Sequence, residues 1–148
     1  MVCPKSVGYI KLRTGNAQDY PVIQPNLLTH EDDMTILVEG VKLSRRIAAA
    51  PALARYRERE YLPGDEAQSD DALREAIRRH VQTLYHPVGT CKMGADPMAV
   101  VNDRLQVNGV EGLCVADASI MPTIVNANTN IPSILIGEKA ADLIRGRS

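Results

Sequence analysis

The stretch Tyr85-His86-Pro87-Val88-Gly89-Thr90-Cys91-Lys92-Met93-Gly94 carries the most information in this chain. Pro87 lacks a backbone donor and pushes the preceding residue, His86, out of helical geometry. A helix arriving from the N-terminal side is therefore expected to stop at His86. Histidine titrates close to neutral pH, so a histidine held at such a point suits the role of general base. A helix-terminal histidine that interacts with the last carbonyl groups explains the local pattern at least as well.

Two further segments, Val115 to Pro122 and Asn126 to Pro132, follow about thirty residues later in the chain. Asp117 comes directly after an apolar stretch and precedes the small residues Ala118 and Ser119, which would let a ligand approach the backbone. An aspartate that merely closes a turn at the end of a strand is an equally good interpretation.

The second segment contains three asparagines, which are common in turns and at helix N-termini. Capping alone explains Asn130, whereas Asn128 needs another partner, and a substrate oxygen is one candidate. The helix N-terminus behind these residues offers unpaired N–H groups and a partial positive charge. An anionic ligand group would be stabilised there.

The first half of the chain predicts a strand and two helices. Residues 7–14 alternate with period two, as a strand with one solvated face does. Thr29 is predicted to cap a helix that ends near Ala50, before Pro51. That helix carries two apolar stripes, so we expect it to be covered on both sides. A short helix is then expected from Pro51 to about Tyr61.

The second half predicts two more helices joined by extended segments. Ser69 is expected to cap a helix that runs towards His86 and buries one apolar stripe, formed by Leu73, Ala76, Ile77, Val81 and Leu84. Residues 100–107 are predicted to be extended, and Leu113 to Ala116 to form a strand that ends at Asp117. The last helix is expected to begin between Asn130 and Pro132.

The composition excludes several classes of protein. A length of 148 residues fits one domain, and a net charge of −1, from 17 basic and 18 acidic residues, argues against nucleic-acid binding. Three widely spaced cysteines favour a reducing compartment, so cytoplasmic residence is expected. The sequence shows no signal peptide and no membrane span. The spacing of His80, His86 and Cys91 matches no common metal motif, and no G-x-G-x-x-G pattern is present.

Taken together, these segments resemble the C-terminal domain of the glucose-methanol-choline (GMC) oxidoreductase family, and its choline and alcohol dehydrogenase branch in particular. The specific parts are His86 to Gly94 and Asn128 to Pro132. Four further blocks along the chain support the resemblance: Gly8 to Leu12, Pro21 to Leu28, Glu39 to Lys42 and Ile136 to Asp142.

The resemblance implies an α+β fold, with an antiparallel or mixed sheet and helices packed on one face. It also implies an FAD enzyme that oxidises a small-molecule alcohol to an aldehyde or ketone, with hydride passing to flavin N5. His86 would accept the hydroxyl proton, and Asn128 would hydrogen-bond the same oxygen. Asp117 and Ala118 would meet the phosphate and ribitol region of FAD, and the backbone near Thr129 and Asn130 its pyrimidine edge.

Family members carry the dinucleotide fingerprint in a long N-terminal FAD-binding portion that residues 1–148 do not contain. A truncated gene, an expressed domain and one part of a split protein all fit this sequence. We therefore expect the isolated chain neither to bind FAD tightly nor to turn over alcohol. The missing portion would have to be supplied in cis or in trans.

Residues 112–148 are expected to pack on the FAD domain in full-length relatives. Without that domain, several apolar side chains would lack cover: Leu113, Val115, Ile134, Leu135 and Leu143. We therefore expect a homo-oligomer. The alternative function is a non-catalytic interaction or oligomerisation module that retains the fold.

Overall fold

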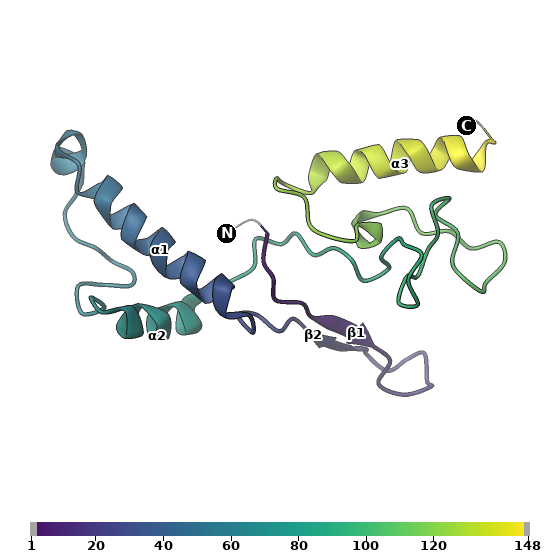
Figure 1. Ribbon diagram of the computed structural model, residues 1–148, viewed down its shortest axis with the longest axis horizontal. Coiled ribbons are helices and arrows are strands. Elements are labelled where there is room, and N and C mark those ends of the chain that lie inside the picture. Colours follow the sequence, from purple (N-terminus) through teal and green to yellow (C-terminus); the bar gives the residue numbers. More distant parts are fainter. Residues whose placement is uncertain (1–2, 147–148) are drawn as a thin grey trace. The chain divides into compact units, whose positions relative to one another are not determined.

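The computed structural model describes residues 3–146 of the chain, and these residues form two compact units, 3–82 and 83–146. The sequence predicts a single domain, so the division is a finding of the structure. Helices and a small antiparallel sheet give the α+β class that the sequence predicts (Figure 1). None of the helices in residues 3–146 combines the length and the hydrophobicity needed to cross a lipid bilayer.

The first unit opens with a short hairpin. Strand β1 (Tyr9–Lys11) pairs antiparallel with β2 (Val22–Gln24), and Ile10 lies opposite Ile23. The predicted strand over residues 7–14 is correct in place but too long, because only Tyr9–Lys11 pair with β2.

Helix α1 (Glu31–Ala48) follows the hairpin. Its N-cap is His30, whose Nδ1 accepts from the backbone N–H of Asp32 at 3.2 Å. The prediction that Thr29 caps this helix is therefore wrong. The Thr29 hydroxyl instead donates to the carbonyl of Asn26, 3.0 Å away.

The carboxylate of Asp33, in the first turn of α1, ties the start of the chain to this helix. Asp33 is only 1% exposed and accepts from the backbone N–H groups of Lys5 and Ser6, each at 2.8 Å, and from the Ser6 hydroxyl. Burial opposes ionisation of this carboxyl, but the hydrogen bonds outweigh it and hold the pKa of Asp33 below its ordinary value.

Helix α2 (Asp70–His80) lies beside α1 in this unit (Figure 1). As predicted, Ser69 is its N-cap, and the Ser69 hydroxyl accepts from the N–H of Ala72 at 3.2 Å. The shared core consists of Met34, Val38, Ala67 and Leu73. Between the two helices, residues 51–56 form a 3₁₀ helix, η1 (Pro51–Tyr56), which is shorter than predicted.

Two predictions about these helices are wrong. Helix α2 ends at His80 and does not continue to His86, because Leu84 and Tyr85 beyond it are exposed and find no core. The second apolar stripe of α1, formed by Ile36, Leu43 and Ile47, is about half exposed, so α1 is not covered on both faces within residues 3–146.

The second unit contains little regular structure before its helix α3 (Asn130–Ile144), which begins where the sequence predicts. The chain from residue 93 to 114 makes only isolated bridges among the described residues, such as Val101 with Val107 and Gln106 with Cys114. The predicted strand from Leu113 to Ala116 is thus reduced to one bridge, and Leu113 is exposed. The core of the unit consists of Val101, Leu105, Ile120 and Ala140.

Candidate active site

The segment that carries His86 lies against the segment that carries Asp117. The N–H of Cys91 donates to the Ser119 carbonyl at 3.0 Å, and the N–H of Met93 donates to the Ile120 carbonyl at 2.8 Å. Two stretches about thirty residues apart in sequence are therefore neighbours in the second unit.

Gly89 lets the chain pass close to this neighbour. Its φ is +83°, a left-handed conformation that glycine adopts readily, and a Cβ built there would lie 3.3 Å from the carbonyl oxygen of Met121. The backbone conformation close to His86 therefore favours glycine at position 89.

His86 itself reaches the start of α3. Its side chain is half-buried, and its Nδ1 atom lies 3.1 Å from the hydroxyl oxygen of Thr129. This contact spans 43 positions of sequence. The contact places the His86 imidazole beside Thr129, which directly follows Asn128 in the sequence.

Thr129 occupies the N-cap position of α3, but its hydroxyl does not cap the helix. Thr129 is 8% exposed, and no side chain among the described residues makes a capping hydrogen bond at this end. The Thr129 carbonyl accepts from both the N–H of Ser133 at 3.0 Å and the Ser133 hydroxyl at 2.7 Å. Asn130 is the first helical residue and not the cap, which corrects the interpretation of that asparagine.

The side chains of Asn128 and Asn130 are exposed on either side of buried Thr129. The helix end behind them keeps its first N–H groups without a side-chain acceptor. Such a terminus carries a partial positive charge and can stabilise a carbonyl oxygen or an anion.

Asp117 closes a turn, which is one of the two interpretations that its place in the sequence allowed. Its Oδ1 accepts from the N–H of Ser119 at 2.7 Å, which caps the 3₁₀ turn η2 (Ala118–Ile120). Hydrogen bonds from the Ser119 hydroxyl and amide hold the pKa of Asp117 below its ordinary value. The exposed carboxylate is thus ionised near neutral pH. Ala118 beside it is half-buried.

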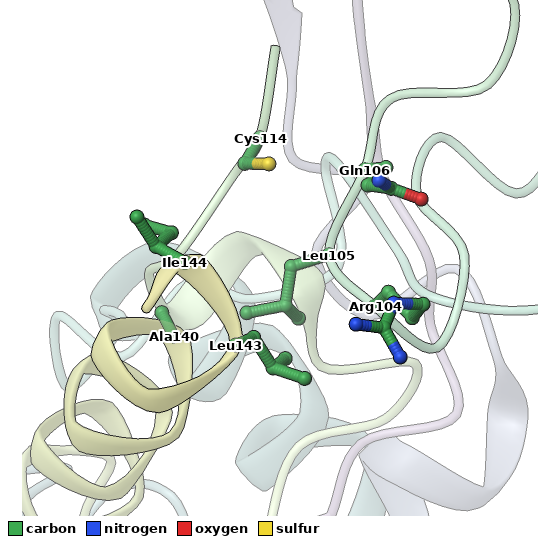
Figure 2. Close-up of a pocket in the computed structure, with 7 residues that line it drawn as sticks. All are labelled: Arg104, Leu105, Gln106, Cys114, Ala140, Leu143 and Ile144. Carbon is green, nitrogen blue, oxygen red and sulfur yellow. The ribbon is translucent and has the colours of Figure 1, made fainter. Parts of the chain in front are cut away.

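A pocket of about 230 Å³ lies towards the C-terminal end of α3 (Figure 2). Helix α3 contributes Ala140, Leu143 and Ile144 to its lining, and the remaining lining residues are Arg104, Leu105, Gln106 and Cys114. No residue predicted from the sequence as part of the site lines it. No pattern in the sequence indicated this pocket, because the lining residues outside α3 lie in irregular chain that shows no periodicity.

Comparison with known proteins identifies the family. A family model described as GMC oxidoreductase matches residues 4–137. The chain is 46% identical over 143 residues to an oxygen-dependent choline dehydrogenase of Cronobacter sakazakii, covering 97% of this chain and 26% of that protein. It is 47% identical over 141 residues to an alcohol dehydrogenase [acceptor] of Pseudomonas putida, covering 95% of this chain and 26% of that protein.

Solved structures agree with the sequence matches. Pyridoxine 4-oxidase from Mesorbium loti superposes with a TM-score of 0.90 at 33% identity, over 99% of this chain and 29% of that one. The chain thus spans about a quarter of the length of the curated relatives it matches. It belongs to the GMC oxidoreductase family, as the C-terminal domain.

Proposed function

We propose that this chain is the substrate-side part of an FAD-dependent oxidoreductase that acts on CH–OH groups. One observation carries the proposal: the two most specific blocks, His86 to Gly94 and Asn128 to Pro132, meet in the second unit, where His86 contacts Thr129 beside Asn128. The names of the relatives, choline dehydrogenase and alcohol dehydrogenase, support an alcohol as the substrate class.

In this proposal, His86 is the base that takes the proton from the substrate hydroxyl. The exposed amide of Asn128 hydrogen-bonds the same oxygen and steadies the negative charge that develops on it. A positioned base contributes typically about 10²- to 10⁴-fold to the rate. Neither group removes the hydrogen from carbon, so the site needs a hydride acceptor.

Bound FAD would supply that acceptor at its N5 atom. The residues present fit such a group, because the N-terminus of α3 at Thr129 and Asn130 has no side-chain cap and can face a carbonyl edge that becomes negative on reduction. Asp117 and Ala118 would meet the ribitol and phosphate region. Since the Asp117 carboxylate is ionised and exposed, it suits the ribitol hydroxyl groups, which donate, and would be repelled by phosphate oxygens.

The proposal also covers the partners and the location of the protein. The FAD-binding N-terminal portion is supplied in cis or in trans, the isolated chain associates with itself, and the protein resides in the cytoplasm. The half-buried Cys91 and the exposed Cys114, which form no disulfide, are compatible with a reducing compartment.

The test is a chimera in which this chain replaces the matching C-terminal quarter of the Pseudomonas putida alcohol dehydrogenase. We expect the purified chimera to contain FAD and to reduce an artificial electron acceptor when alcohols are added. His86→Gln should lower kcat about 10²-fold or more while FAD stays bound. Asn128→Ala should lower it less, because it removes one hydrogen bond to the developing charge.

The isolated 148-residue chain is the matched control, and it should show neither bound flavin nor turnover. A chimera that binds FAD and oxidises alcohols equally well after both His86→Gln and Asn128→Ala would contradict the assignment. A chimera that holds FAD but oxidises no alcohol would favour the non-catalytic module instead.

A further inference from the structure

The Thr129 side chain stands at a position where threonine normally caps a helix, yet it serves another group. A capping hydroxyl accepts from a backbone N–H in the first helical turn. Here the backbone of Thr129 is itself helical, with φ −81° and ψ −4°, and no capping bond forms. The hydroxyl oxygen instead lies 3.1 Å from His86 Nδ1.

The surroundings fix the Thr129 hydroxyl in place. The side chain is more than nine-tenths buried, and its own carbonyl is held twice by Ser133. Because no helix amide uses the hydroxyl as an acceptor, its lone pairs remain available to the imidazole.

We propose that Thr129 is a positioning residue that accepts a hydrogen bond from Nδ1–H of His86, and so reserves the lone pair of Nε2 for the substrate proton. This inference rests on the proposed role of His86 as the base. In neutral histidine one ring nitrogen carries the proton and the other accepts, and the partner of one nitrogen determines the state of the other.

The direction of this hydrogen bond follows from the proton cycle of a base. Nδ1 carries a proton in the Nδ1–H neutral tautomer and also in the imidazolium form. A hydroxyl that accepts from Nδ1 therefore keeps the same bond before and after Nε2 takes a proton. A hydroxyl that donates to Nδ1 would have to reverse its bond at each turnover, and Nε2 would begin protonated and unable to act as a base.

Another histidine of the same chain, His30, provides a reference for the tautomer protonated at Nε2. His30 Nδ1 accepts from the N–H of Asp32, so the proton of neutral His30 resides on Nε2. His80 at the end of α2 is exposed and provides a third signal. The three histidines of the sequence should therefore be distinguishable in one spectrum.

The experiment is ¹⁵N–¹H correlation of the histidine rings in the full 148-residue chain, at a pH where they are neutral. The His86 signals are assigned from their loss in His86→Gln. We expect a protonated Nδ1 and an unprotonated Nε2 for His86, the reverse of His30. Thr129→Ser should preserve this pattern, and Thr129→Val should move His86 towards the pattern of exposed His80.

Ser133→Ala is the matched control, because it removes a hydrogen bond to the same residue without removing the hydroxyl that faces His86. It should leave the His86 signals unchanged. An unprotonated Nδ1 in the unmodified chain would refute the proposal, and that measurement needs no variant. The proposal therefore stays testable even if Thr129→Val does not fold.

Turnover in the chimera provides the second measurement. Thr129→Val should lower kcat by up to about 100-fold with little change in KM, and Thr129→Ser should restore it. Because the ring-nitrogen spectrum needs no flavin, the positioning role and the proposed oxidation of alcohols can fail separately. Equal kcat for the valine and threonine proteins would also refute the positioning role.

Discussion

At the scale of single residues, side chains in this protein are fixed by contacts that sequence patterns do not show. His86 and Asn128 were identified as candidates from the sequence and the family resemblance. The Thr129 hydroxyl was not, because the resemblance gives a role only to the backbone near Thr129 and Asn130, and the cap was assigned to Asn130. Asp33 is similar: a carboxylate in the first turn of a helix suggests a favourable dipole interaction, but its burial and its bonds to Lys5 and Ser6 become visible only in the structure.

We predict that Asp33→Asn destabilises the chain by about 2 kcal/mol, because one oxygen that accepts hydrogen bonds is replaced by a donor that faces other donors. Urea unfolding measures the change. Asp32→Asn is the control. Asp32 pairs with Lys5 on the surface, where solvent weakens the ion pair, so Asp32→Asn should unfold at nearly the same urea concentration as the unmodified chain.

Asp33→Asn should also change how the stability of the chain depends on pH. Hydrogen bonds hold the pKa of folded Asp33 below its ordinary value of 3.8, so its stabilisation is present above pH 3.8 and is lost as the pH falls from there through the lower pKa of the folded state. Thermal unfolding between about pH 6 and pH 2 should show the advantage over Asp33→Asn shrinking in acid. A constant advantage over this range would contradict the account of Asp33.

At the scale of elements, the sequence predicted those features that depend on local chemistry. Ser69 caps α2 as expected, and α3 begins at the asparagine-rich turn. The errors arise where tertiary packing decides. The apolar spacing continues past His80, but the helix ends there because none of the described residues covers Leu84, which is exposed. A hydroxyl at position 29 and an imidazole at position 30 both can cap, and the structure uses the imidazole.

Packing between α1 and α2 should depend on Leu73, which is fully buried in their shared core. We predict a loss of about 2–4 kcal/mol for Leu73→Ala, since the side chain leaves a cavity. Ile36→Ala on α1 is the matched control. Because Ile36 is 49% exposed, the change there should be below about 1 kcal/mol. Similar losses in urea unfolding for the two variants would show that this core is misidentified.

At the scale of the whole molecule, the described residues bury few large apolar side chains. Leu113, Ile134 and Leu135 in the second unit are exposed, as expected for surfaces whose partner is absent. Val115 and Leu143 differ from that expectation, because both are partly buried against the core of their own unit. The family resemblance predicted exposed apolar side chains within residues 112–148, but the structure exposes such side chains in the first unit too, for example Leu12 and Ile23.

The exposed side chains predict self-association of the isolated chain. Light scattering should show an average mass that rises with concentration, and Leu135→Glu should reduce that rise. Leu12→Glu in the first unit, where the side chain is also exposed, is the matched control and should have little effect. A constant monomer mass at high concentration would contradict this prediction.

The uncapped start of α3 has a practical consequence for anyone who wishes to make this domain more heat-resistant. Helix ends without a side-chain acceptor are common targets, because aspartate or asparagine at an N-cap position with extended backbone typically adds about 1 kcal/mol. At position 129 the backbone is helical and Pro132 offers no N–H, so either residue would bury a polar group without adding a cap and would remove the hydroxyl that His86 contacts. Stability and proton transfer would both be harmed there, and engineering is better directed to other helix ends.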